Sequence, residues 1–197
     1  MKPDAERIFL AGATGVLGVR LVPLLVAEGH TVAAMTRSPD KAASLQTLGA
    51  EPVVCDAFDR RAVREAVVAF RPDVVIDELT DLPDDVSLVS DYAAANARIR
   101  RVGSRNVLAA ARAAHTSRIF AQSVAWQLPG DGGVAVAEHE RSVLAAKGVV
   151  LRYGKLYGPG TYYEREVPTP PRIHVDEAAR RTIAALDTRS GVLTIVE

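Results

Sequence analysis

Short apolar runs alternate along the chain with longer segments whose apolar residues recur every three or four positions. Such runs are typical of buried strands, and the longer spacing is typical of helices that bury one face. The expected strands are Arg7–Ala11, Thr31–Met35, Glu51–Cys55, Asp73–Asp77, Arg118–Gln122, Val149–Arg152 and Val192–Val196. The expected helices are Gly15–Glu28, Pro39–Leu48, Asp59–Phe70, Leu88–Ala114 (which Gly103 can interrupt), Val136–Ala146 and Asp176–Leu186.

Strands that alternate with helices and are apolar throughout predict a parallel sheet that is covered on both faces. Right-handed crossovers then give an α/β fold, a doubly wound sheet of about seven strands in one domain over residues 1–197. The segment 158–173 breaks the alternation, because it carries four prolines and two tyrosines. We expect a loop or short hairpin there, long enough to line a pocket.

The composition narrows the range of functions. Lys plus Arg and Asp plus Glu both number 24, and the resulting net charge of zero argues against a nucleic-acid-binding surface. Cys55 is the one cysteine, so an intrachain disulfide and a cysteine-cluster metal site are excluded, and a buried, inert thiol is expected. Four scattered histidines predict no metal cluster, and no serine stands in a Gly-x-Ser-x-Gly motif.

Residues 1–7 are polar and lack the apolar core of a signal peptide. No stretch of the sequence is apolar and long enough to span a bilayer. A soluble cytoplasmic protein without a membrane partner is therefore expected.

The strongest motif is Gly12-Ala13-Thr14-Gly15-Val16-Leu17-Gly18, which directly follows an expected strand and opens an expected helix. Gly12 permits a sharp turn, Gly15 lets a pyrophosphate approach the backbone, and Gly18 lets the helix pack closely on the sheet. The free N–H groups at the start of the helix favour an anion. The motif thus predicts a dinucleotide site of the Rossmann type.

The end of the second expected strand indicates which dinucleotide is bound. NAD-selective sites usually have an acid there that binds the ribose hydroxyls, whereas this chain has Arg37, then Ser38 and Lys41. Arg37 can form a charge-assisted pair with a 2′-phosphate, with Ser38 and Lys41 nearby. NADP(H) is therefore the expected cofactor. Asp56, after the third strand, either lies beside the adenine or caps a turn.

Further segments resemble the short-chain dehydrogenase/reductase superfamily, specifically its atypical and extended NAD(P)-dependent epimerase/dehydratase branch. The matching segments are Gly12–Gly18, Asp73–Asp77, Asn106–Arg112, Leu151–Gly160 and Ile173–Arg180, which occur in family order. The resemblance implies that the pyrophosphate is held by Gly12, Thr14, Gly15, Val16, Leu17 and Gly18. It also implies Asp56 and Ala57 beside the adenine, Glu78, Leu79 and Thr80 along the ribose, Gln122 and Ser123 at the active-site edge, and Tyr153 and Leu156 beside the nicotinamide.

The chain departs from this family at the catalytic pair. The family has a tyrosine four residues before a lysine on the helix after the fifth strand, where the tyrosine exchanges a proton with the substrate. None of the five tyrosines here has a lysine four residues later, and the helix around residues 137–141 has no tyrosine. The substrate domain of the family is also reduced to one loop and one helix. The usual Tyr–Lys mechanism is therefore not supported.

Several groups could replace that pair. Ser123 could hydrogen-bond a substrate carbonyl or only cap its strand. Tyr157 could act as a surrogate acid or pack against its neighbours, and Lys155 could act in acid/base chemistry or stay solvated. His139 is expected to face solvent among charged neighbours. Three further aromatic residues either line a flat apolar pocket or pack in the ordinary way: Trp126, Tyr162 and Tyr163.

Three functions remain open. The first is an NADPH-dependent reductase or epimerase-like enzyme that acts on a small molecule and takes protons from water or a substitute side chain. The second is a non-enzymatic NADP(H)-binding redox sensor, and the third is a non-redox dehydratase or cyclase on the same scaffold. A homodimer through residues 88–114 is also compatible with the sequence.

Overall fold

The computed structural model describes residues 5–197; residues 1–4, part of the polar N-terminal segment considered above, lie outside the described residues. The main sheet has seven parallel strands in the order β3-β2-β1-β4-β5-β6-β9, which confirms the doubly wound α/β fold. Its strands are β1 (Arg7–Ala11), β2 (Thr31–Thr36), β3 (Glu51–Val54), β4 (Val74–Asp77), β5 (Arg118–Val124), β6 (Val149–Tyr153) and β9 (Gly191–Ile195).

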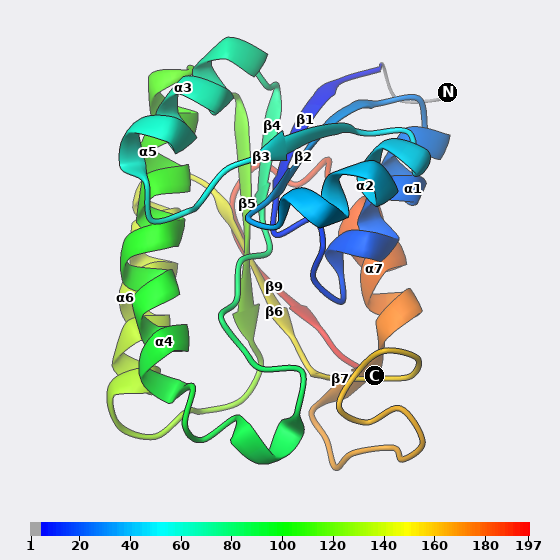
Figure 1. Ribbon diagram of the computed structural model, residues 1–197. Coiled ribbons are helices and arrows are strands. Elements are labelled where there is room, and N and C mark those ends of the chain that lie inside the picture. Colours follow the sequence, from blue (N-terminus) through cyan, green and yellow to red (C-terminus); the bar gives the residue numbers. More distant parts are fainter. Residues whose placement is uncertain (1–4) are drawn as a thin grey trace.

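Helices form a layer on each face of this sheet (Figure 1). One layer consists of α1 (Gly18–Ala27), α2 (Ala42–Thr47) and α7 (Val175–Ala184). The other consists of α3 (Arg60–Phe70), α4 (Ala93–Arg98), α5 (Ser104–Ala113) and α6 (Gly130–Ala145). Shorter helical turns are η1 (Pro39–Lys41), η2 (Val86–Leu88) and the π-helical turn η3 (Ile99–Gly103), which joins α4 to α5.

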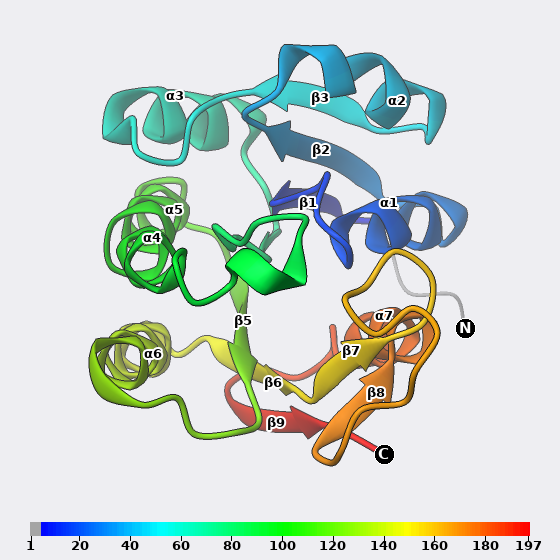
Figure 2. The same ribbon diagram turned by 60° about the horizontal axis from the view of Figure 1, so that its bottom comes forward.

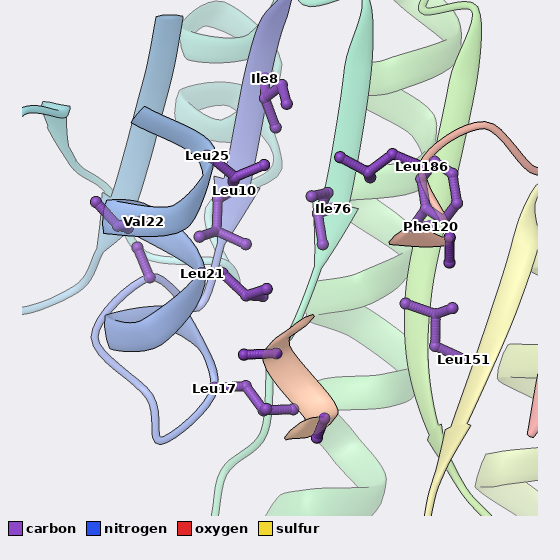
Figure 3. Packing of buried hydrophobic residues seen from close by; sticks show 14 of the residues in the cluster. Ile8, Leu10, Leu17, Leu21, Val22, Leu25, Ile76, Phe120, Leu151 and Leu186 are labelled. Carbon is purple, nitrogen blue, oxygen red and sulfur yellow. The ribbon is translucent and has the colours of Figure 1, made fainter. Parts of the chain in front are cut away.

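Two apolar cores result from the alternation of side chains along each strand. Ile8, Leu10 and Ile76 belong to the core under α1 and α7, where Leu21 and Leu25 of α1 meet the sheet (Figure 3). The intervening strand residues, such as Phe9 and Val75, belong to the second core under α3 and α5. Both faces of the central strands are therefore buried, as the continuous apolar runs predicted. The predicted burial of Cys55 is also confirmed.

The direction in which the chain winds reverses between β1 and β4, which lie side by side at the centre of the sheet. Ligands of doubly wound sheets bind outside the carboxyl ends of the strands at such a switch point. Figure 2 looks onto the sheet with that side turned towards the viewer, and the loops after β1, β4 and β7 come together there. The fold thus places the glycine motif and the residues after β4 at one edge.

The structure differs from the sequence expectation, or specifies it further, in three places. Part of the segment 158–173 is ordered as a small parallel sheet, in which β7 (Lys155–Tyr157) pairs with β8 (Arg172–His174). Helix α6 begins at Gly130, six residues before the expected start, although glycine is a poor helix former. Gly133 is required there because a Cβ at this position would lie 2.2 Å from the Leu128 carbonyl oxygen. The expected break near Gly103 is the π-helical turn η3.

Among residues 5–197, no helix is long and apolar enough to cross a membrane.

Candidate functional site

The glycine motif forms a tight turn between β1 and α1. Gly12 has φ +82°, a conformation that favours glycine, and a Cβ there would lie 2.7 Å from the carbonyl oxygen of Glu78. A Cβ on Gly18 would lie 2.3 Å from the carbonyl oxygen of Gly12. The roles that the sequence suggested for these two glycines, a sharp turn and close packing of the helix, therefore agree with the backbone geometry.

The same turn leaves backbone donors free. The N–H of Gly15 donates to the Gly12 carbonyl at 3.0 Å, and the N–H of Val19 donates to Gly15 at 3.1 Å. No acidic side chain occupies the first turn of α1. Within residues 5–197, no hydrogen-bond acceptor faces the N–H groups of Thr14, Val16, Leu17 and Gly18. These donors and the helix dipole make the turn an anion site for which a pyrophosphate is a suitable ligand.

Arg37 directly follows β2. Its guanidinium is largely exposed and lies 3.3 Å from a carboxylate oxygen of Asp81, in the loop after β4. Ser38 is held beside it, because its N–H donates to Thr36 Oγ1 at 3.1 Å. Lys41 ends the exposed turn η1. The cations that the sequence assigned to a 2′-phosphate therefore gather at one edge, but Arg37 has an anionic partner.

Asp56 and Ala57 follow β3. Asp56 Oδ1 accepts a hydrogen bond from the Phe58 N–H at 2.9 Å, so its side chain caps a turn, which was one of the two expectations. The Ala57 carbonyl accepts from Asn106 Nδ2 at 2.9 Å, which ties this turn to α5. Both residues thus shape the backbone at the expected adenine side.

Glu78 follows β4 and is buried. The hydroxyl of Tyr153 lies 2.9 Å from Glu78 Oε1 and 2.6 Å from Thr182 Oγ1, so the carboxyl group belongs to a buried polar chain between β4, β6 and α7. Burial raises the pKa of Glu78 to about 8, with a further increase from Asp77 and opposing effects of Tyr153 and Arg100. The side chains of Glu78 and Tyr153 therefore point into the core rather than along a ribose or a nicotinamide.

Leu79 and Thr80 continue this loop at the crevice. The Leu79 N–H donates to Asp77 Oδ1 at 3.1 Å, and its carbonyl accepts from Gln122 Nε2 at 2.9 Å. The loop after β4 is thereby joined to the carboxyl-terminal part of β5. Thr80 is exposed. Leu156 packs against the first core as part of β7.

On the opposite face of β4, Asp77 lies near Arg100 of η3 and His139 of α6. Arg100 is almost wholly buried, and its Nη1 has no hydrogen-bond partner among the described residues. Burial lowers the pKa of the Arg100 guanidinium, whereas the charges of Asp77, Glu140 and Glu78 raise it. His139 is also buried, with a pKa lowered chiefly by burial, which corrects the expectation that it faces solvent.

The periodicity of α6 explains this correction. Ala135, His139 and Val143 are each four residues apart and are all buried, so they form the inward stripe of the helix. The charged neighbours of His139 obscured that spacing in the sequence. The early start of α6 at Gly130 brings Ala135 into the stripe.

Ser123, at the end of β5, donates a hydrogen bond from Oγ to Glu140 Oε1 at 2.6 Å. Arg152 of β6 holds the same carboxylate with Nε at 2.8 Å and Nη2 at 2.6 Å. Burial raises the pKa of Glu140, but the hydrogen bonds and charges around it, mainly those of Arg152 and Ser123, lower the pKa below its usual value. The proton of Ser123 is thus directed to Glu140.

Lys155 and Tyr157 are engaged with residues near the small sheet of β7 and β8. Lys155 Nζ donates to Thr169 Oγ1 at 2.9 Å and to the Thr169 carbonyl at 3.2 Å. The Tyr157 hydroxyl donates to Glu197, and its ring packs edge-on against His174 with a centroid separation of 5.2 Å. Both belong to the small sheet of β7 and β8, and neither is brought beside Ser123 by a hydrogen bond.

The loop after β4 and the loop between β7 and β8 are in contact. The Tyr162 hydroxyl, in the loop between β7 and β8, donates to the Pro83 carbonyl in the loop after β4. Arg20 of α1 holds the start of the loop between β7 and β8 by donating to the Pro159 carbonyl, and it also pairs with Asp176 of α7 at 2.7 Å. In the part of the chain from residue 5 onward, no three potential metal ligands converge.

The sequence profile of NAD(P)H-binding proteins matches residues 12–153, which run from the glycine turn to the end of β6. The chain belongs to this NAD(P)H-binding family. A relative from a Streptomyces species, 3-diazoavenalumate denitrifying reductase, is 36% identical over 234 aligned positions, which cover 97% of this chain and 76% of the relative. The alignment is longer than this chain, so the relative has insertions that this NAD(P)H-binding protein lacks.

Solved structures show the same fold at low identity. The UDP-glucose 4-epimerase of Thermus thermophilus in complex with NAD superposes with a TM-score of 0.78 at 18% identity, over 96% of this chain and 77% of that chain. A short chain dehydrogenase from Burkholderia cenocepacia in complex with NADP gives a TM-score of 0.77 at 21% identity, over 98% of this chain and 89% of that one. This NAD(P)H-binding protein thus has the fold of the short-chain dehydrogenase/reductase superfamily.

Sequence reasoning missed four residues that shape the site of this NAD(P)H-binding protein. Each acts through a contact or charge distant in sequence; the four are Asp81, Arg100, Glu140 and Arg152. Only Glu140 and Arg152 could have been found from the sequence. Glu140 interrupts an otherwise apolar face of a helix, and Arg152 interrupts an otherwise apolar strand.

Proposed function

We propose that this protein is an NADPH-dependent reductase that delivers hydride to the diazo or diazonium group of an aromatic substrate, with loss of N2. Its Streptomyces relative is named for a diazo substrate and for reductive removal of nitrogen, and the match extends over nearly the whole of this chain. The backbone turn at residues 12–18 suits the pyrophosphate of the dinucleotide. When bound, NADPH supplies the hydride.

One observation carries the proposal: the side chains that could have donated a proton are engaged elsewhere. Ser123 donates to Glu140, Lys155 to Thr169 and Tyr157 to Glu197. Helix α6, from Gly130 to Ala145, has neither tyrosine nor lysine in its sequence. The arrangement supports a reaction that needs hydride but no proton from the protein.

Reduction of a carbonyl group needs both a hydride and a proton, because the alkoxide that forms must be neutralised. An aryl diazonium cation differs, since its positive charge is cancelled by the hydride itself. Hydride adds to the outer nitrogen to give a neutral aryl diazene, the C–N bond then breaks with release of N2, and the hydrogen ends on the ring carbon. Atoms and charge balance without a protein acid.

The preference for NADPH over NADH is supported by Arg37. No acid ends β2, and Arg37 and Lys41 follow it, so a 2′-phosphate bound beside them would find a guanidinium suited to charge-assisted hydrogen bonds. The Burkholderia structure shows that this fold accommodates NADP, while the Thermus structure contains NAD. Arg37 is therefore the residue on which cofactor choice depends.

The test is a comparison of substrates with purified protein. NADPH consumption and N2 release would be measured under anaerobic conditions with a panel of hydroxyaryl diazonium compounds and a matched panel of ketones and enones. Gly12→Val, which fills the turn, is the control for direct reaction between NADPH and substrate. We expect N2 release to exceed that of the variant, with little turnover of ketones. Equal rates for protein and variant, or faster ketone reduction, would contradict the proposal; tight NADPH binding without any turnover would favour a redox sensor.

A further inference from the structure

The hydrogen bonds that link Glu78, Tyr153 and Thr182 can be assigned by counting the hydrogens that these side chains can donate. Thr182 Oγ1 donates to the Ala178 carbonyl at 2.8 Å, and a carbonyl can only accept. The Thr182 hydroxyl has one hydrogen, so the link to Tyr153 at 2.6 Å requires the Tyr153 hydroxyl to donate to Thr182. The hydrogen of Tyr153 is then used, and the remaining link, at 2.9 Å, requires a hydrogen on Glu78.

A neutral carboxylic acid therefore satisfies all three links, whereas a carboxylate leaves three short contacts with two hydrogens. Glu78, Tyr153 and Thr182 are buried, with exposed fractions of 7%, 4% and 0%, so water does not readily supply the missing donor. A buried polar group without its partner is costly. The charged groups that act on Glu78 are Asp77, the residue before it at the end of β4, and Arg100 of η3, and their effects on its pKa oppose one another.

Glu78 also forms one wall of the glycine turn. Its N–H donates to the Ala11 carbonyl at 3.0 Å, immediately before Gly12. Its own carbonyl oxygen lies where a Cβ on Gly12 would point, at 2.7 Å. A displacement of Glu78 is therefore transmitted directly to the backbone that receives the pyrophosphate.

We propose that Glu78 is a positioning residue for the dinucleotide turn that works in its protonated form: the neutral acid holds the wall of the turn in place, and the carboxylate disrupts it. The proposal depends on dinucleotide binding by this family and not on the diazo substrate. It predicts that the affinity for NADPH falls when Glu78 loses its proton.

The experiment measures the dissociation constant of NADPH between about pH 7 and pH 9 for the wild type and for Glu78→Gln, an uncharged isostere of the acid. With a pKa of about 8, the protonated fraction falls from about nine-tenths to about one-tenth, so the wild-type Kd should rise about tenfold. Glu78→Gln should show no such rise. Glu65→Gln, an exposed carboxylate on α3, should follow the wild type.

A second measurement keeps the proposal testable if Glu78→Gln does not fold. The side-chain carboxyl carbon of Glu78 can be followed by NMR in the labelled wild-type protein as pH increases. Titration near pH 8 together with the rise in Kd supports the proposal. Titration near the ordinary pKa of glutamate, a flat wild-type Kd, or the same rise in Kd for Glu78→Gln would overturn it. A failure of diazonium reduction would leave all these readouts unchanged.

Discussion

The guanidinium of Arg37 lies 3.3 Å from the carboxylate of Asp81, and the pair joins the loop after β2 to the loop after β4 across the carboxyl end of β1. Arg37 is 66% exposed and Asp81 only 16% exposed at the side chain, so the acid is held by the fold while the arginine can reorient. The residue proposed to bind the 2′-phosphate of NADPH must therefore exchange one anion for another.

Arg37→Ala should weaken NADPH binding more than NADH binding, because only NADPH carries the 2′-phosphate. We expect a loss of about ten- to a hundredfold for NADPH, on the order of 1.5–3 kcal/mol for a charge-assisted hydrogen bond. Fluorescence titration with both nucleotides measures the change. Arg61→Ala, an exposed arginine on α3, is the control. Equal losses for NADPH and NADH would refute the assignment of the 2′-phosphate site.

Asp81→Asn should have the opposite effect. Removal of the carboxylate frees Arg37 to pair with the phosphate, so NADPH affinity should increase up to about fivefold, within the range of exposed ion pairs. NADH affinity should change less. The same titration in the double variant Arg37→Ala/Asp81→Asn should show no gain from the asparagine; a persisting gain would mean that Asp81 acts without Arg37.

Gly18→Ala should damage both stability and binding. The added Cβ would lie 2.3 Å from the Gly12 carbonyl oxygen and 2.6 Å from the Ala13 carbonyl carbon, and both neighbours are backbone atoms that cannot rotate away. We expect a loss of roughly 1–3 kcal/mol in the free energy of unfolding, as in overpacked cores, and at least about a tenfold rise in the Kd for NADPH. Denaturant melts and nucleotide titration measure the two effects.

Gly132→Ala is the matched control for this substitution, because the added Cβ would meet only the Leu128 side chain ahead of α6, at 3.9 Å. It should preserve binding and leave stability unchanged or slightly higher, since alanine favours helix. If both glycine variants bound NADPH normally, the close approach of α1 to the turn would not be required for the site.

Glu78 should also make stability depend on pH. Its folded pKa of about 8 lies above the ordinary value of 4.5, so the native state retains a proton that the unfolded chain releases in that interval. The contribution of Glu78 is fully present below about pH 4.5 and is lost as pH rises through about 8. Glu78→Gln should remove this decline and be more stable than the wild type above pH 8, by roughly 1–3 kcal/mol. Urea denaturation at a series of pH values tests it; parallel curves for both proteins would contradict it.

The contribution of the Glu140–Arg152 pair to stability should depend on pH in the opposite direction. The net pKa of Glu140 is lowered, so its contribution is present above the ordinary pKa of glutamate and lost as pH falls through the lowered value. Arg152→Ala should reduce stability near neutral pH by roughly 1–3 kcal/mol and flatten the loss on acidification. Arg180→Ala, whose pair with Glu177 is more exposed, is the control. An unchanged acid limb in Arg152→Ala would exclude this role.

The parts of the site that the sequence predicts are those set by neighbours in the chain. Gly12 and Gly18 belong to one turn, so their spacing in the sequence predicts the backbone geometry of that turn. The position of Arg37 at the carboxyl edge followed from the shared direction of parallel strands, while its role toward a 2′-phosphate stays a prediction. The order of strands and helices could also be predicted, because apolar periodicity is a pattern among neighbouring residues of the chain.

The remaining parts depend on contacts between distant segments. Asp81 meets Arg37 across 44 positions, and Tyr153 meets Glu78 across 75. Ser123 looked like an open hydroxyl at a strand end, and only the packing of α6 against β5 reveals that its proton is directed to Glu140. His139 was misplaced because charged neighbours outweighed its four-residue spacing from Ala135 and Val143. Local patterns cannot report such contacts.

The central claim is that a hydride from NADPH, and no proton from the protein, reduces the substrate. It is tested most directly by a single turnover with NADPH deuterated at nicotinamide C4 and an aryl diazonium substrate in ordinary water, followed by mass spectrometry of the product. The account predicts deuterium at the ring position that carried nitrogen, lost when Gly12→Val replaces the wild-type protein. Because the N–H of an aryl diazene can exchange with water, the isotope effect on NADPH oxidation is measured as well; a ring hydrogen entirely from water together with no isotope effect would contradict it.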